Sequence, residues 1–208
     1  MLYEYIKANY APNEPILSNE LQKYPYKSTS LRQELKSLTD KGLLRRYDRG
    51  IYYLPKMTIF NIEAVPSRNS IIEKKYLKQD NENIGYVSGL GLANQLGLTS
   101  QVASVVEIVT NKATKEYKEL SIGNVTVIMR KPKITIDSTN YQVLQFLDLI
   151  KDINAFLEIS KKEAKEKMLL YIQKTGLLFS TIEKYLKYYP PIVYKNLYEM
   201  GFFINAYS

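Results

Sequence analysis

The sequence predicts an α+β protein: an N-terminal winged helix-turn-helix, then an α/β domain with a small sheet, then a helical C-terminal tail. Segment 16–55 is typical of helices followed by a hairpin, β-branched runs separated by turn residues lie within 104–130, and apolar residues recur at helical spacing from 141 onward. A hydrophobic fraction of 45% and a mean hydropathy of -0.28 indicate an ordinary globular chain. We expect three domain ranges: 1–56, 57–153 and 154–208.

Segment 16–55 begins with two predicted helices, and the second is the better defined. Ser30 is placed to cap it, with Gln33 three residues later as the partner in a capping box. Leucines recur on one face of this helix at Leu31, Leu35 and Leu38. Gly42 then ends the helix at a position that favours a left-handed backbone conformation.

A short basic hairpin follows the second helix directly. Segment 43–47 is expected to form a strand, Asp48-Arg49-Gly50 a tight turn and segment 51–54 the returning strand. A recognition helix that leads straight into a basic hairpin matches the shape of one DNA groove and its flank. The same turn would also form with no DNA nearby, and the tyrosines of these strands suit strand packing better than base stacking.

The charge of the chain favours a polyanionic partner. Lys and Arg number 29 against 21 Asp and Glu, a net charge of +8 with a pI near 9.3. Segment 1–56 holds ten basic and six acidic residues, so half of the net charge lies in about a quarter of the chain. The alternative is a solvated basic surface with no bound partner.

The cations and polar residues of segment 27–49 are the candidate contacts to double-stranded DNA. Polar side chains near the start of a recognition helix reach base edges, whereas exposed Lys and Arg contact phosphates. We expect base or near-base contacts from Ser28, Thr29, Arg32, Gln33 and Lys36. We expect phosphate and wing contacts from Lys27, Arg45, Arg46 and Arg49. Simpler interpretations remain: the serines suit a helix start, and Arg32 with Lys36 is a spacing that any exposed helix carries.

The absence of two residue types restricts the possible chemistry. The chain has no His and no Cys, which excludes thiolate nucleophiles, His-dependent triads, zinc sites of the Cys/His type and disulfides. We expect no catalytic residues, no metal and no cofactor. No window approaches the roughly 18 apolar residues that cross a bilayer, and segment 1–10 lacks the apolar stretch of a signal peptide, so we expect a cytoplasmic protein without membrane contact.

Beyond Pro55 the composition changes. Residues 57–60 are expected to form a short exit segment, followed by a helix over 69–79 and a polar run to 83. The glycine-rich block 84–99 lacks the Lys-Ser/Thr that follows the glycines of a phosphate loop, and Asn94 stands where a dinucleotide fingerprint requires its third glycine. We therefore expect a close-packed helix against a sheet. Strands at 104–110, 120–122 and 125–130 should form that sheet, beneath a helix at 141–153. Further helices are expected at 160–174, 179–188 and 190–200.

Three segments carry a resemblance to a known family. Gly50 to Pro55 at the end of the hairpin, the block Ile84–Leu90 with Asn94–Thr99, and Tyr189-Pro190-Pro191 resemble the AbiEi-type antitoxins and their relatives over nearly the whole chain. The resemblance implies an antitoxin of a type IV toxin-antitoxin system of the abortive-infection kind. Its winged helix would repress its own operon at inverted repeats, with dimerisation on DNA left open. The rest would counter a nucleotidyltransferase-like toxin without a stable complex.

Three hypotheses therefore stand. The first is a DNA-binding antitoxin and autorepressor. The second is a plain winged-helix regulator whose middle domain senses a ligand or partner, which predicts DNA binding without rescue from a toxin. The third is a metal-dependent nuclease or another enzyme in the middle domain, built from Glu107, Lys112 and Asp137; their spacing matches no metal-binding pattern, so solvated surface is the better interpretation.

Overall fold

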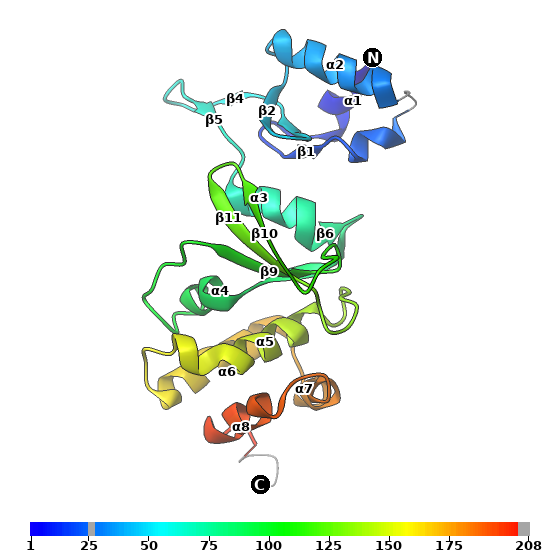
Figure 1. Ribbon diagram of the computed structural model, residues 1–208. Helices are drawn as coiled ribbons and strands as arrows, with labels where there is room; N and C mark the ends of the chain where they lie inside the picture. The colour runs from blue at the N-terminus through cyan, green and yellow to red at the C-terminus, as the bar shows by residue number, and fades with distance from the viewer. Residues whose placement is uncertain (25–27, 204–208) are drawn as a thin grey trace. The chain divides into compact units, whose positions relative to one another are not determined.

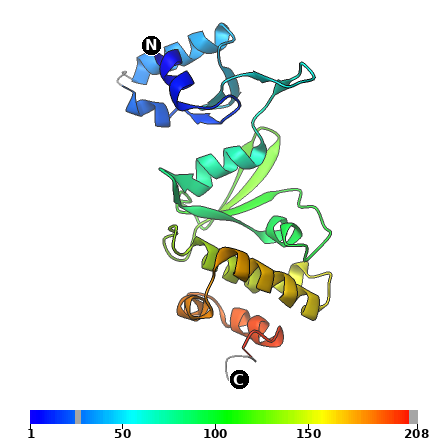
Figure 2. The same cartoon turned by 180° about the vertical axis from the view of Figure 1, so that it is seen from behind.

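The computed structural model describes residues 1–24 and 28–203, and of Lys23, Ser28 and Thr29 only the backbone. The protein is a mixed α+β protein with several small sheets (Figures 1 and 2). It divides into two compact units, Met1–Lys75 and Tyr76–Ser208, each with an apolar core of its own. The first unit therefore continues past residue 56, where we expected the first domain to end, and the helical tail shares the core of the second unit.

The first unit combines a three-stranded sheet with helices on a leucine-rich core. Its leading elements are α1 (Leu2–Asn9), β1 (Ile16–Leu17), the 3-10 helix η1 (Glu20–Lys23), α2 (Ser28–Asp40), β2 (Arg45–Asp48) and β3 (Ile51–Tyr53). The strand order is β1-β3-β2, and both pairings are antiparallel. The core brings together side chains from α1, β1, η1, α2 and the hairpin: Leu2, Ile6, Ile16, Leu21, Leu31, Leu35, Leu38, Leu44 and Leu54.

The predicted helix, glycine and hairpin of segment 30–54 are confirmed, with two corrections. Leu31, Leu35 and Leu38 are buried, and Gly42 adopts the left-handed conformation with φ of 71°. Ser30, however, lies inside α2, because the helix already begins at Ser28; a capping residue would keep an extended backbone outside the helix. The segment before α2 forms a strand and a 3-10 turn where we expected a helix, since Ile16 and Leu17 pair with β3.

Residues 56–83 hold two short hairpins that the sequence did not predict. The exit segment forms β4 (Lys56–Met57) and β5 (Glu63–Ala64), which pair antiparallel. Ser67 then caps α3 (Arg68–Ile72), its hydroxyl oxygen accepting a hydrogen bond from Ser70 N. One π-helical turn, η2 (Glu73–Leu77), ends the predicted helix earlier than expected, and the polar run forms β6 (Lys78–Gln79) and β7 (Glu82–Asn83).

The second unit is built on a four-stranded sheet in the order β10-β11-β9-β8. Its strands are β8 (Gly85–Ser88), β9 (Val106–Thr110), β10 (Tyr117–Ile122) and β11 (Val125–Arg130). The predicted strands and their Gly123-Asn124 turn are confirmed, and block 84–99 supplies a further strand and the short helix α4 (Gly89–Gln95). Only β9 and β11 are parallel; the other neighbours are antiparallel.

The predicted C-terminal helices are confirmed. They are α5 (Tyr141–Phe156), α6 (Lys161–Thr175), α7 (Phe179–Leu186) and α8 (Pro191–Glu199). Helix α5 packs on the sheet beside α4, and α7 and α8 pack on α5, so the apolar face of α5 lies at the centre of the second core (Figure 2). Ser160 caps α6, and Gly176 ends it in the left-handed conformation.

Candidate nucleic-acid interface

Helix α2 presents a polar, basic face to solvent. Arg32, Gln33 and Lys36 are exposed, on the side of the helix away from its buried leucines. No ion pair involves Arg32 or Lys36 within the part of the chain that the structure describes. Because like charges four residues apart on a helix repel each other, this arrangement costs the isolated helix a few tenths of a kcal/mol, roughly 0.2 to 0.5. An anion bound at this face would remove that cost.

The hairpin after α2 adds two exposed arginines. Arg49 lies in the turn, where its backbone N donates to Asp48 Oδ1 at 2.6 Å, and Arg46 donates from Nε to the Asp48 carbonyl oxygen at 3.3 Å. Gly50 closes the turn with φ of 74°, and its carbonyl oxygen accepts from Ser18 N at 2.9 Å. The turn is thereby fixed to the residue after β1, which positions Arg49 at the edge of the first unit's sheet.

Arg45 differs from its neighbours because it has an internal partner. Its Nε lies 3.0 Å from both carboxylate oxygens of Glu63 on β5, and its Nη1 donates to the Gly42 carbonyl oxygen at 3.3 Å. Glu63 also accepts from the Tyr53 hydroxyl at 3.1 Å, and burial together with this carboxylate raises the pKa of Tyr53. Arg45 and Tyr53 thus fasten the β4–β5 hairpin to the sheet.

Three of the predicted contact residues cannot be placed. Lys27 lies outside the described residues, and the side chains of Ser28 and Thr29 lie outside them as well, although the backbone of the latter two forms the start of α2. The structure therefore brings together Arg32, Gln33 and Lys36 on one helix face, and Arg46 with Arg49 on the adjacent hairpin. Arg45, in contrast, is paired with Glu63 on β5.

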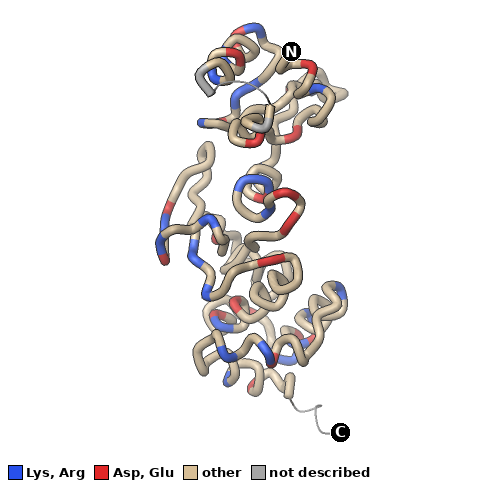
Figure 3. The backbone as a smooth tube through the Cα atoms, turned by 90° about the vertical axis from the view of Figure 1, so that its right-hand side faces the viewer, with Lys and Arg blue, Asp and Glu red and all other residues tan. Residues whose placement is uncertain are grey.

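Both acidic and basic residues are distributed over the rest of the first unit, as Figure 3 shows. Lys74 lies 2.5 Å from Glu14 and 3.7 Å from Glu20, so its charge is neutralised. Tyr10 packs beside this group: its ring lies beneath the Lys74 ammonium, and burial and the Glu20 carboxylate raise the pKa of Tyr10. The basic face of α2 lacks such compensation, which distinguishes it from this side of the unit.

The second unit holds a buried polar cluster that the sequence did not predict. Ser88 at the end of β8 donates to Asp148 Oδ2 on α5 at 2.5 Å. Arg130 at the end of β11 donates from Nη2 to the same Asp148 oxygen at 2.7 Å and to Ser88 Oγ at 2.8 Å. Lys151 reaches Asp148 Oδ1 at 2.8 Å. Four side chains from three elements thus form one closed network.

The electrostatics of this cluster favour a structural role. Burial disfavours the charged form of Asp148, but Arg130 and Lys151 outweigh it and hold the pKa of this carboxyl below its ordinary value. Asp148 therefore stays ionised and is a poor proton acceptor for Ser88. Gly89 follows Ser88 with φ of 65°, a conformation that favours glycine, and a side chain here would displace the Glu107 carboxylate.

The residues of the nuclease hypothesis are not brought together as a metal site. Glu107 lies against Gly89, with its Oε2 3.7 Å from Arg130 Nε. Asp137 instead lies in the turn before α5, where its Oδ1 accepts from Thr139 Oγ1 at 2.6 Å, Thr139 N at 2.8 Å and Asn140 N at 3.0 Å, and these hydrogen bonds lower its pKa. No group of three or more acidic side chains that could hold a metal occurs among residues 1–24 and 28–203.

Comparison with known proteins identifies the family. A model described as a family of unknown function, DUF6088, matches residues 16–175. The chain belongs to the DUF6088 family. The match runs from β1 through α6, so it spans the α2 face, the hairpin and the buried cluster of the second unit. The sequence matches no curated protein. Over the described residues, no helix has the length and apolar character needed to cross a membrane.

Proposed function

We propose that the first unit is a winged helix-turn-helix that binds double-stranded DNA through α2 and the β2–β3 hairpin. Its element order of α1, β1, η1, α2, β2 and β3, with the sheet order β1-β3-β2, supports this proposal. In such a module the second helix of the motif enters the major groove. The observation that carries the proposal is the exposed face of α2, where Arg32 and Lys36 form no ion pair with any residue that the structure describes.

Some side chains of the proposed interface would contact bases and others would contact phosphates. Arg32 and Gln33 have the donor geometry that reads base edges, Arg to guanine and Gln to adenine. Lys36 and Arg49 would contact phosphates, which adds affinity at any sequence and makes binding depend on salt. Arg45 would act indirectly, because its guanidinium is already held by Glu63.

Selection of binding sites from a random duplex pool by the full chain tests this function. We expect enrichment of one sequence, with a Kd that rises steeply with salt because phosphate contacts release counterions. The Lys133→Ala variant should select the same sequence as the wild type, since this exposed lysine of the second unit lies outside the proposed face. A pool without enrichment and without affinity for any duplex would contradict the proposal.

We further propose that the protein is an antitoxin, without a catalytic role of its own, that represses its own operon. The sequence resemblance of block 84–99 to AbiEi-type antitoxins supports this narrower proposal, in which the second unit counters a nucleotidyltransferase-like toxin. Co-expression with the toxin encoded beside it should restore cell growth. The Arg32→Ala/Lys36→Ala variant should still restore growth while it no longer represses the operon. DNA binding without rescue would indicate a plain winged-helix regulator instead.

A further inference from the structure

The β4–β5 hairpin exposes a run of apolar side chains without any charge. Within residues 57–65, five apolar side chains are more than half exposed, at 53% to 94%: Met57, Ile59, Phe60, Ile62 and Val65. Residues 57–62, which we call the apolar tip, carry no acidic or basic side chain. Single exposed apolar residues are ordinary, whereas a contiguous run of this kind marks an interaction site.

The apolar tip satisfies several of its polar groups internally. Thr58 N donates to the Ile62 carbonyl oxygen at 2.8 Å, and Asn61 N donates to the Thr58 carbonyl oxygen at 3.0 Å. The Thr58 hydroxyl oxygen also accepts from Ile62 N at 3.2 Å. Because an unpaired N–H or C=O group is costly in an apolar surrounding, these hydrogen bonds suit the tip to a site that is poor in water.

The hairpin is fixed to the β2–β3 sheet and projects from the first unit, as Figure 1 shows. Arg45 Nε and the Tyr53 hydroxyl both donate to the Glu63 carboxylate on β5. The side chains of the tip take no part in the leucine-rich core of this unit. The tip is therefore held in its exposed position by contacts at the base of the hairpin.

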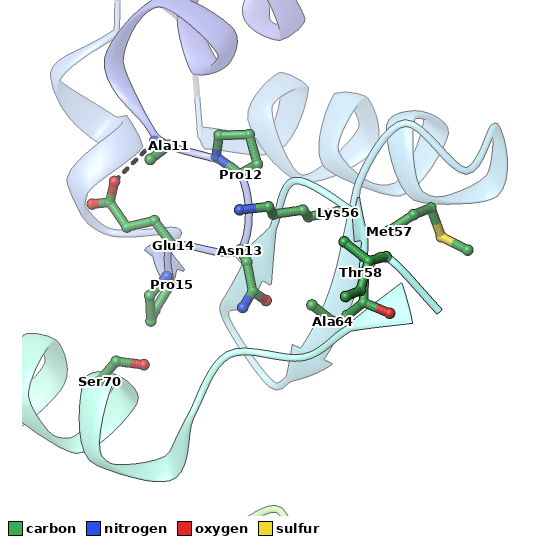
Figure 4. Close-up of a pocket in the computed structure, with 11 residues that line it drawn as sticks. Ala11, Pro12, Asn13, Glu14, Pro15, Lys56, Met57, Thr58, Ala64 and Ser70 are labelled. Carbon is green, nitrogen blue, oxygen red and sulfur yellow. Dashed lines mark hydrogen bonds between the residues drawn. The ribbon is translucent and has the colours of Figure 1, made fainter. Parts of the chain in front are cut away.

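Two basic side chains flank the hairpin. Lys56 at its start and Arg68 shortly after its end are exposed, and neither forms an ion pair with a residue that the structure describes. In Figure 4, Lys56 points toward the loop of residues 11–15, while Met57 points away from this loop. The Lys56 ammonium therefore lies beside the base of the hairpin and leaves the tip uncharged.

Two acidic side chains near the base are neutralised. Glu14, which lines the groove beside Lys56, lies 2.5 Å from Lys74 Nζ. Glu63 accepts from Arg45 Nε at 3.0 Å. The charges of the flanking cations remain uncompensated, and they complement an anionic surface that the tip contacts.

We propose that the β4–β5 hairpin docks on an anionic lipid bilayer, with the apolar tip inserted among the lipid headgroups. Ile59, Phe60 and Ile62 are each at least 66% exposed, so the tip is apolar on all sides. A protein interface instead combines an apolar centre with a polar rim. The three residues from Lys56 to the turn span about 10 Å at roughly 3.3 Å per residue, which matches an insertion depth of about 5 to 10 Å. One hairpin makes this contact, so it needs no spanning segment.

A tryptophan reporter tests the insertion, and the chain is suited to it because it contains no Trp. The full chain with Phe60→Trp is mixed with vesicles of equal parts phosphatidylcholine and phosphatidylglycerol. We expect its emission to shift to shorter wavelength, since the indole moves from water to the bilayer interface. Val102→Trp is the matched control: Val102 is 86% exposed on the second unit, and this variant should show no shift. No shift for Phe60→Trp, or an equal shift for both variants, would overturn the proposal.

Flotation with the same vesicles measures what each part of the hairpin contributes. Phe60→Asp should weaken binding more than tenfold, because it removes a large apolar side chain from the inserted tip. Lys56→Ala should weaken binding about fivefold, the contribution of one cation near an anionic bilayer. Val102→Asp should bind as the wild type does. Binding of Phe60→Asp equal to that of the wild type would contradict insertion of the tip.

The Arg32→Ala/Lys36→Ala variant separates this contact from the proposed DNA binding. It should float with the vesicles nearly as the wild type does while it loses affinity for duplex DNA, and Phe60→Asp should show the reverse. Loss of vesicle binding in the α2 variant, with none in Phe60→Asp, would place the lipid contact on α2 and overturn the proposal. A wild-type chain that binds duplex DNA but no vesicles would overturn it as well, and would leave the proposed function unaffected.

Discussion

Arginine is used in opposite ways in the two units. In the first unit, Arg32 and Arg49 are exposed, and no ion pair with another described residue neutralises either of them. In the second unit, Arg130 is largely buried; it forms an ion pair with Asp148 and donates hydrogen bonds to Asp148 and Ser88. The comparison teaches that the distance between a guanidinium and the nearest carboxylates, rather than the residue type, decides whether an arginine stays available to a partner or stabilises the fold.

Arg45 lies between these two cases. It belongs to the hairpin beside α2, yet its Nε donates to both carboxylate oxygens of Glu63 at 3.0 Å. Its side chain is 41% exposed. An exposed ion pair of this kind contributes little to stability, about 0 to 1 kcal/mol. Its main consequence is therefore positional, because it determines where the β4–β5 hairpin stands.

Arg130→Ala should give the largest effect of the variants, a loss of stability. A small loss would contradict the structural role that we assign to Arg130. Removal of this side chain leaves the buried Asp148 short of a partner and should lower the free energy of unfolding by about 3 to 5 kcal/mol. Urea denaturation followed by far-UV circular dichroism measures the change. Lys133→Ala, which removes an exposed pair at 3.9 Å, should cost less than about 1 kcal/mol. Equal losses for the two variants would show that the cluster does not stabilise the fold.

Arg32→Ala and Gln33→Ala should each weaken binding at the cognate site by about 1 to 3 kcal/mol and relax sequence preference there. Their free energies of unfolding should stay within roughly 0.5 kcal/mol of the wild type, since both side chains are exposed. Fluorescence anisotropy with cognate and random duplexes measures the two affinities. If Arg32→Ala loses affinity equally on both duplexes, Arg32 does not contact bases.

Asp148 should make the second unit sensitive to acid. Because its pKa is lower in the folded than in the unfolded protein, it stabilises the fold above its unfolded pKa, about 3.9, and this contribution is lost as pH falls toward the folded value. The free energy of unfolding should therefore fall with decreasing pH below about 4. Asp148→Asn should flatten this part of the profile. An unchanged slope in the variant would mean that other carboxyl groups determine the acid sensitivity.

Arg49→Ala should give a smaller, sequence-independent effect on DNA binding. The loss of one phosphate contact should reduce the slope of log Kd against log salt by about one. Arg45→Ala should change this slope less, because the Glu63 carboxylate already neutralises the Arg45 charge. A larger change for Arg45→Ala than for Arg49→Ala would reverse the roles that we assign to the two residues.

Sequence patterns within a few residues predicted the helices, the strands and the left-handed glycine that depend on neighbouring residues. The leucines of α2, the left-handed Gly42 and the strands around Gly123-Asn124 all follow from spacing within a few residues. The two-residue strands β1, β4 and β6 could not be predicted, because each is defined only by its partner strand. Ser30 was misplaced because its sequence suits a cap, while the helix starts two residues earlier.

The candidate site and the buried cluster differ in the same way. The exposed face of α2 could be predicted, since Arg32, Gln33 and Lys36 fall opposite the apolar positions of one helix. The pairing of Arg45 with Glu63 joins residues 18 apart in two separate hairpins, and no spacing rule connects them. The cluster of Ser88, Arg130 and Asp148 draws on three elements spread over 60 residues. Such contacts follow from tertiary structure alone.

The most direct test of DNA binding through α2 compares two triple variants of the full chain. One is Arg32→Ala/Lys36→Ala/Arg49→Ala; the other, Lys131→Ala/Lys133→Ala/Lys195→Ala, removes the same charge from exposed positions of the second unit. Anisotropy with the duplex upstream of its own coding region, at several salt concentrations, should show the first variant with a salt slope lower by about two, since Lys36 and Arg49 are the phosphate contacts, and the second with nearly wild-type affinity. Equal losses in the two variants would contradict the account, because binding would then follow net charge and not the α2 surface.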